Sequence, residues 1–211
     1  MAAMLKSVNV GITQTIELGR QTVPTGIFKR PAPEAIHAGR LGLTGDVQLD
    51  RRHHGGPDKA VNVYPSEHYS YWSERLAGDL GPGSFGENFT TTGLFEEEVA
   101  IGDILKIGAA LFQVTQPRQP CGKLAARHRE PNLVRMVYES GRTGFYLRCL
   151  QPGKVQQGDA ISTTERPADC ITVLEALRIM ERRDDAAAIE RLLAIEALSE
   201  AWREEISQRS K

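Results

Sequence analysis

A lone cysteine in a basic segment is the first candidate for chemistry in this sequence. Cys121 lies between Pro120 and Gly122, a context that favours a loop over a strand. Arg118 and Lys123 lie close by, and positive charge lowers the pKa of a thiol by stabilising the thiolate. A thiolate ligates a soft metal or attacks an electrophile, whereas an inert buried cysteine is the commoner alternative. The local chemistry leaves both interpretations open.

The other two cysteines are predicted to be structural. Cys149 alternates in phase with Phe145 and Leu147, which favours a place in the core of a strand. Cys170 stands beside Asp169 where the helical tail begins. Three cysteines without framework spacing favour free thiols and a reducing cytoplasm.

A second candidate segment combines glycines with positive charge. Gly55 and Gly56 let the backbone approach a ligand closely or present consecutive N–H groups. Arg51, Arg52 and Lys59 lie on either side of these glycines, so the segment could hold an anionic group such as a phosphate. A Gly-rich surface turn with solvated charges is the alternative interpretation.

The paired histidines next to these glycines make a poor chelate. Side chains of neighbouring residues diverge in an extended chain, so His53 and His54 would not point to one ion. A zinc site that adds Cys121 to the two histidines is conceivable, but no standard ligand spacing supports it.

A third candidate is the segment GPGSFGENFT, residues 81–90, whose glycines and small polar side chains suit a loop that folds over a bound molecule. Asn88 in this segment offers both a donor and an acceptor, although a plain turn would look similar. The sequence contains no Walker loop, no GxGxxG, no HExxH and no GxSxG, which removes the common nucleotide, zincin and hydrolase motifs.

Short strands must position these segments. Alternating polar and apolar residues, punctuated by Gly-Asp and Pro-Gly turns, predict an antiparallel sheet or barrel. The predicted strands span residues 7–12, 59–64, 99–101, 104–107, 111–115, 145–150 and 160–163. Helices are predicted from Pro65 to Gly78 and from Pro131 to Gly141, because proline suits the first helical turn and glycine the position after the last.

The composition changes near residue 167, where Gly and Pro give way to Ala, Leu, Glu and Arg. We place a domain boundary there, between residues 1–166 and residues 167–211. The tail predicts three short helices, capped by Thr172, Asp185 and Ser199. Helices of about ten residues are unstable alone in water, so they must pack on each other, on the first domain or in a homodimer.

Charge and hydropathy argue against several classes of protein. The 211 residues include 26 Lys and Arg against 27 Asp and Glu, a net charge of -1, which gives no electrostatic basis for binding nucleic-acid polymers or a membrane surface. No apolar run approaches the ~20 residues of a membrane span, and the first residues show no secretory signal. We therefore expect a cytoplasmic protein.

Four segments occur in a specific order: RRHHGGPDKAVNVYPSEHY, GSFGENFTTTGL, VAIGDIL and FQVTQPRQPCGKL. Taken in this order, they resemble the MOSC domain superfamily, in particular its bacterial branch of 6-hydroxylaminopurine-resistance (YiiM-like) proteins. The resemblance covers essentially the whole chain. It implies a mainly β fold with α, namely a MOSC-type antiparallel β-barrel followed by a small C-terminal three-helix domain.

The resemblance also implies a cofactor: a molybdenum atom held by a pterin dithiolene, with a phosphate on the pterin. By the same resemblance, Cys121 would be the protein ligand to molybdenum. One wall of the pocket would comprise His54, Gly55, Gly56 and Lys59. A second wall would comprise Ser84, Phe85, Glu87 and Asn88, and the metal would be flanked by Gln116, Arg118 and Lys123.

The activity that the resemblance implies is reduction of N-hydroxylated compounds, such as hydroxylaminopurine bases, to amines. The protein would supply binding, orientation and electrostatics, and we expect His54 to deliver a proton. Three cysteines are too few for an iron–sulfur cluster, so electrons would come from a separate reductase. Two alternatives stay open: a non-catalytic carrier of the molybdenum cofactor, and a metal-free thiol or sulfur-transfer protein that uses Cys121.

Overall fold

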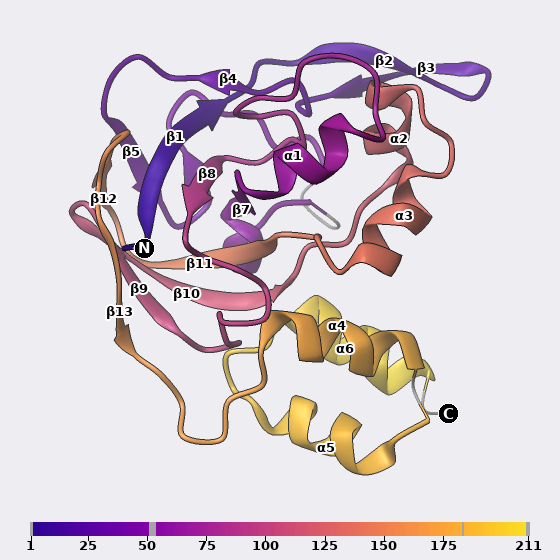
Figure 1. Cartoon of the computed structure of the whole chain (residues 1–211). Helices are drawn as coiled ribbons and strands as arrows, with labels where there is room; N and C mark the ends of the chain where they lie inside the picture. The colour runs from indigo at the N-terminus through magenta and orange to yellow at the C-terminus, as the bar shows by residue number, and fades with distance from the viewer. Residues whose placement is uncertain (1, 51–53, 183, 210–211) are drawn as a thin grey trace.

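An eight-stranded sheet forms the centre of the molecule (Figure 1). The computed structural model describes residues 2–50, 54–182 and 184–209. Along the sheet the strands follow the order β13-β9-β10-β11-β7-β8-β1-β4. Their bounds are β1 (Met4–Val10), β4 (Arg30–Pro31), β7 (Val61–Pro65), β8 (Phe89–Thr92), β9 (Ile104–Ile107), β10 (Ala110–Pro117), β11 (Phe145–Gln151) and β13 (Ile161–Glu165).

The main sheet is mixed and open, which corrects the predicted antiparallel barrel. β7 and β8 run parallel, with Val63 opposite Phe89. Parallel neighbours need a crossover connection, and the chain between them supplies one that contains α1 (His68–Ser73). The first residues of β1 reach the start of β13, where they form an isolated bridge, Met4 to Ala160, and backbone hydrogen bonds such as Ile161 N to Ala3 O at 2.9 Å. Among the described strands, no continuous ladder closes the sheet.

Two smaller sheets flank the main one and were not predicted. β5 (Ile36–Gly39), β6 (Gly42–Leu43) and β12 (Gly153–Val155) form one of them. β2 (Gln14–Leu18) and β3 (Gln21–Thr25) form a hairpin that extends past the sheet towards α2 in Figure 1. These strands are short or largely polar, so they give almost no alternating apolar signal. Conversely, predicted strand 99–101 forms only an isolated bridge, from Ala100.

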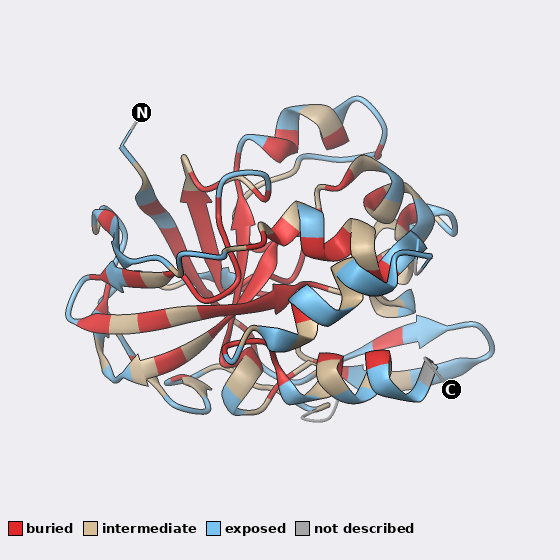
Figure 2. Cartoon of the chain, turned by 90° about the horizontal axis from the view of Figure 1, so that it is seen from below, coloured by how far each residue is buried: buried red, intermediate tan, exposed pale blue. Residues whose placement is uncertain are grey.

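Alternation along the central strands separates an apolar core from a polar face. In β7, Val61 and Val63 are fully buried in the main hydrophobic cluster. In β11, Phe145, Leu147 and Cys149 belong to the same cluster, which confirms the prediction that Cys149 is a core residue. Figure 2 shows the central strands buried along most of their length. Residues between these core positions, such as Asn62 and Tyr146, point to the opposite face.

Three helices lie on the sheet region. α3 (Leu133–Ser140) matches the prediction, and Gly141 ends it in the left-handed conformation at φ 71°. α1 is shorter than predicted, because the chain turns after Ser73. α2 (Gly122–His128) follows Cys121 directly and was not predicted.

The tail forms the three predicted helices, α4 (Val173–Arg182), α5 (Ala186–Ala194) and α6 (Glu200–Arg209), which lie together below the sheet in Figure 1. Each predicted cap is present. Thr172 Oγ1 accepts from Glu175 N at 3.1 Å, Asp185 Oδ1 from Ala188 N at 3.0 Å, and Ser199 Oγ from Trp202 N at 3.3 Å. None of the helices in the described part of the chain is long and apolar enough to span a bilayer.

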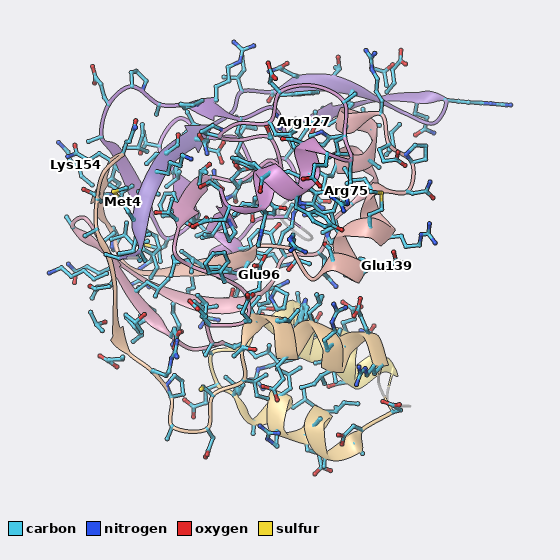
Figure 3. All side chains as sticks on the ribbon, viewed as in Figure 1. Met4, Arg75, Glu96, Arg127, Glu139 and Lys154 are labelled. Atoms are coloured by element: carbon cyan, nitrogen blue, oxygen red, sulfur yellow. The ribbon has the colours of Figure 1, made fainter. Side chains whose placement is uncertain are left out.

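The helical tail and the sheet share one continuous hydrophobic cluster. Ile171 and Trp202 belong to it together with Ile101 of the sheet region. Glu96, labelled in Figure 3 between the sheet and the helices, accepts a backbone hydrogen bond from Leu174 N at 2.8 Å. Apolar contacts therefore cross the predicted domain boundary after residue 166. The division into two domains stays a prediction.

Candidate functional site

A pocket opens where the polar face of the main sheet meets the segment before β7 and the loop that leads into α2. Opposite these lie the residues that follow β3 and the segment 47–50. Its lining comprises Thr25, Gly26, Ile27, Lys29, Val47, Gln48, Leu49, Asp50, His54, Lys59, Asn62, Gly86, Asn88, Arg118, Cys121, Lys123 and Tyr146. Six of the predicted site residues are therefore gathered in one pocket, although they come from three separate stretches of the chain: His54, Lys59, Asn88, Arg118, Cys121 and Lys123.

Cys121 is half-buried in this lining and lies directly before α2. Burial alone would raise the pKa of its thiol. A hydrogen bond with His54, the positive charge of His54 and Arg118, and the backbone N–H of Leu124 outweigh burial and lower this pKa to about 6. The side chain is consequently a thiolate at neutral pH, the form that binds soft metals and attacks electrophiles.

His54 is in turn hydrogen-bonded to a residue of β11. His54 Nδ1 lies 3.3 Å from the hydroxyl of Tyr146, a residue that is 4% exposed. Burial raises the pKa of Tyr146 to about 12, so its hydroxyl keeps its proton at neutral pH. The His54 imidazole is thus held between a tyrosine hydroxyl and the Cys121 thiolate, where it can carry a proton next to the sulfur.

Arg118 is buried in the lining with spare hydrogen-bonding capacity. It is 4% exposed, and its Nη2 donates to Phe85 O at 2.9 Å. Its Nε and Nη1 have no hydrogen-bond partner in the described part of the chain. Buried donors without a partner cost free energy, which is recovered when a ligand supplies an acceptor. Arg118 is therefore prepared to bind an anionic or acceptor-rich molecule.

The other cations of the lining differ in how far their charge is neutralised. Lys29 forms a buried ion pair with Asp46 at 2.5 Å, although burial still lowers the pKa of the lysine. Asn88 Nδ2 donates to the same carboxylate at 2.8 Å, so this wall is held together by its own contacts. Lys123 Nζ donates to a backbone oxygen, Pro24 O, at 3.1 Å. Lys123 and Arg118 therefore keep most of their positive charge for a ligand.

Six residues of the predicted walls lie outside the pocket lining: Gly55, Gly56, Ser84, Phe85, Glu87 and Gln116. Glu87 is fully buried, and its carboxylate accepts from Gly83 N at 2.7 Å and from Phe85 N at 2.9 Å. The ring of Phe85 stacks on Tyr64 with centroids 4.4 Å apart. These two residues shape the loop that carries Asn88. Contact of the six residues with a cofactor remains a prediction.

The sequence predicted six of the lining residues, and those that it did not predict include the polar residues Lys29, Asn62 and Tyr146. Strand pairing brings two of them together, because Asn62 of β7 lies opposite Tyr146 of β11. A polar residue between Val61 and Val63 is a signal that could have placed Asn62 on the face away from the core. No local signal distinguishes Lys29 from a surface lysine.

Taken together, the lining combines a soft anionic ligand, positive charge and unpaired hydrogen-bonding groups. No cluster of three or more His, Cys, Asp or Glu side chains that could hold a metal ion occurs among the described residues. The zinc alternative also needs His53, which lies outside the described residues. Chemically, the pocket suits a group that brings its own additional metal ligands and negative charge.

Both regions of this fold, the sheet with its pocket and the three C-terminal helices, match models of known protein families. The model of the MOSC domain matches residues 50–162, and the model of the YiiM-like, 3-alpha helix domain matches residues 171–209. The chain belongs to the MOSC domain family, in its YiiM-like branch.

Similar proteins cover nearly the whole chain. The uncharacterized protein YflK of Bacillus subtilis is 46% identical over 93% of this chain and 90% of its own length. The crystal structure of YiiM from Geobacillus stearothermophilus matches with a TM-score of 0.85 and 38% identity, over 99% of this chain and 100% of the other. A protein of Gibberella moniliformis named "Reductase" is 32% identical over 86% of this chain, which spans 33% of that longer protein.

Proposed function

We propose that this protein is a molybdenum-cofactor-dependent oxidoreductase that reduces N-hydroxylated compounds, such as hydroxylaminopurine bases, to amines. Membership of the MOSC family and a relative named as a reductase support this proposal. The observation on which it mainly rests is the Cys121 thiol, whose pKa is lowered to about 6 in a pocket that also contains unpaired donors of Arg118.

The side chains of the pocket suit the proposed cofactor. Cys121 Sγ would ligate molybdenum, because a thiolate is a soft, anionic ligand. The spare N–H groups of Arg118 and the ammonium groups of Lys59 and Lys123 would hold the pterin phosphate. When bound, the cofactor would supply the two-electron chemistry that reduces the N–O bond.

The protein would supply the protons of the reaction, and a partner protein would supply the electrons. Reduction of a hydroxylamine to an amine and water consumes two electrons and two protons. His54 would hold a proton on its imidazole, between the Tyr146 hydroxyl and Cys121, and deliver it to the departing oxygen. A separate reductase would deliver the electrons. We propose a cytoplasmic location, where the free thiol of Cys121 stays reduced.

The test is metal analysis and turnover of protein expressed with an intact cofactor pathway. We expect close to one molybdenum and one pterin per chain, and amine formation from 6-hydroxylaminopurine with a chemical reductant. Bound cofactor without turnover of any N-hydroxylated compound would instead identify a cofactor carrier. Protein that retains no molybdenum but modifies substrates through Cys121 would identify a metal-free thiol enzyme. Either result would overturn the proposal.

A further inference from the structure

A buried acceptor in the pocket has no partner and no role in the proposed chemistry. Asn62 is 7% exposed, and its Oδ1 makes no hydrogen bond within the described part of the chain. The rest of the residue is well anchored. Asn62 N donates to Asn88 Oδ1 at 3.2 Å, Asn62 O accepts from Asn88 N at 2.8 Å, and Nδ2 lies 3.5 Å from Gly86 O. In this amide orientation Nδ2 faces Gly86 O, and Oδ1 is left without a partner.

An unpaired buried carbonyl oxygen is costly in a folded protein. Such a group loses its hydrogen bonds to water on burial and normally finds a partner in the fold. Asn62 is the second residue of β7, a buried position where an apolar residue would avoid this cost. The cost is recovered if a bound molecule donates an N–H or O–H to Oδ1.

Other parts of the lining restrict the shape and polarity of that molecule. Ile27, Val47 and Leu49 line the same pocket with apolar side chains, and Leu49 is 45% exposed despite its size. The spare Nε and Nη1 of Arg118 are assigned above to the pterin phosphate, so Asn62 Oδ1 needs a separate donor. A flat heterocycle suits both the apolar side chains and Oδ1, because its faces are apolar and its edge carries N–H donors.

We propose that Asn62 is a recognition residue whose Oδ1 accepts a hydrogen bond from an N–H group on the edge of a bound heterocycle. The inference rests on the proposed function in that two molecules of that reaction have this chemistry: a hydroxylaminopurine substrate and the pterin of the cofactor. Asn62 touches the bound ring and takes no part in the proton transfer.

The test compares Asn62→Ala with the wild-type protein, both loaded with cofactor. Three quantities are measured: pterin released per chain, the Kd of 6-hydroxylaminopurine without reductant, and the unfolding midpoint of cofactor-free protein. Loss of one buried hydrogen bond predicts a Kd about tenfold higher, if the substrate is the donor. If the pterin is the donor, pterin content falls instead. In both cases the midpoint of the cofactor-free protein changes little, because Ala removes the unsatisfied Oδ1 together with only the long 3.5 Å contact of Nδ2.

Thr91 offers a matched control. Its Oγ1 is also buried without a partner, but Thr91 is not part of the pocket lining. Thr91→Val should leave pterin content and Kd unchanged. Unchanged pterin and Kd in Asn62→Ala would overturn the proposal and make Asn62 a structural residue. If wild-type protein reduces no N-hydroxylated compound, the proposed function fails, whereas these binding and stability measurements still test Asn62.

Discussion

Cys121 and Cys149 differ in what surrounds the sulfur. The Cys121 thiol meets His54 and Arg118, which lower its pKa to about 6. The Cys149 thiol is 2% exposed, its nearest polar contact is Ala38 O at 4.0 Å, and burial raises its pKa. One thiol is therefore ionised and reachable from a pocket, whereas the other is a small apolar group of the core.

Substitution by serine should separate these two roles. In Cys121→Ser a hard, protonated hydroxyl replaces a soft thiolate, so molybdenum content and reductase activity should fall by about two orders of magnitude, with little change in folding. In Cys149→Ser an unsatisfied hydroxyl enters the core, so the free energy of unfolding should drop by about 1–3 kcal/mol while cofactor binding survives. Denaturant unfolding and metal analysis check both. Full activity in cofactor-loaded Cys121→Ser would contradict the assignment.

The pH dependence of thiol alkylation tests the electrostatics of the pocket directly. Only the thiolate reacts, and a pKa of about 6 means that the thiolate is lost as the pH falls through 6. In metal-free protein, iodoacetamide should alkylate Cys121 about tenfold faster at pH 7.5 than at pH 5, with a midpoint near 6. Mass spectrometry resolves the three cysteines, and Cys149 serves as the unreactive internal control. A midpoint above 8 would show that His54 and Arg118 do not stabilise the thiolate.

At the scale of secondary-structure elements, α6 and its cap contact the residues 116–120 that lead to Cys121. Ser199, the cap of α6, donates from its Oγ to Gln116 Oε1 at 2.5 Å, and both residues are fully buried. Further along, Gln119 Nε2 donates to Glu205 Oε2 of α6 at 3.0 Å. The end of β10 and the residues between it and Cys121 are thus each held by one contact from α6 or its cap.

This contact predicts that the tail influences the thiol. Ser199→Ala removes the hydrogen bond to Gln116 and the cap of α6, so we expect about 1–2 kcal/mol lower unfolding free energy and slower alkylation of Cys121 at pH 6.5. Thr172→Ala is the control. It removes the equivalent cap of α4, the hydrogen bond from Glu175 N to Thr172 Oγ1, and leaves the hydrogen bond between Ser199 and Gln116 in place. Equal alkylation rates in the two variants would show that α6 only contributes stability. Ser199→Thr, which keeps the hydroxyl, should restore the rate.

At the scale of the whole molecule, the helical tail completes the core of the sheet region. Backbone hydrogen bonds join Ile101 N to Ile171 O at 2.9 Å and Val173 N to Val99 O at 2.8 Å. Trp202 is 1% exposed within the shared hydrophobic cluster. The tail also contacts α3, because Arg178 Nη2 of α4 donates to Glu139 O at 3.1 Å. Figure 3 labels Glu139 near the end of α3.

A chain that ends at Arg166 should therefore keep its strands but lose much of its stability. The strand ladders lie almost entirely before this point, so the β-type circular dichroism should persist. Apolar surface that the tail covers would be exposed to water, which predicts an unfolding midpoint more than 10 °C lower and a tendency to aggregate. An unchanged midpoint would show that the two regions are independent domains, and loss of all β signal would show that the boundary lies elsewhere.

Several features of this protein could be read from short stretches of its sequence. The caps at Thr172, Asp185 and Ser199 were predictable because a cap depends on residues within one turn. Alternation placed Cys149 in the core, and neighbouring cations singled out Cys121. In each case the relevant physical interaction acts between residues that are close along the chain.

Features that depend on contacts between distant residues could not be predicted from short stretches of sequence. The parallel pairing of β7 with β8 depends on the path of the crossover between them, and neither strand encodes that path. Asn62 and Tyr146 lie opposite each other because of strand register, although 83 residues separate them in the sequence. The Glu87 carboxylate points into its own loop because the backbone N–H groups of Gly83 and Phe85 need an acceptor. Which polar side chains face the pocket was therefore decided by packing of the whole chain, since free energy of burial is summed over contacts that no short segment contains.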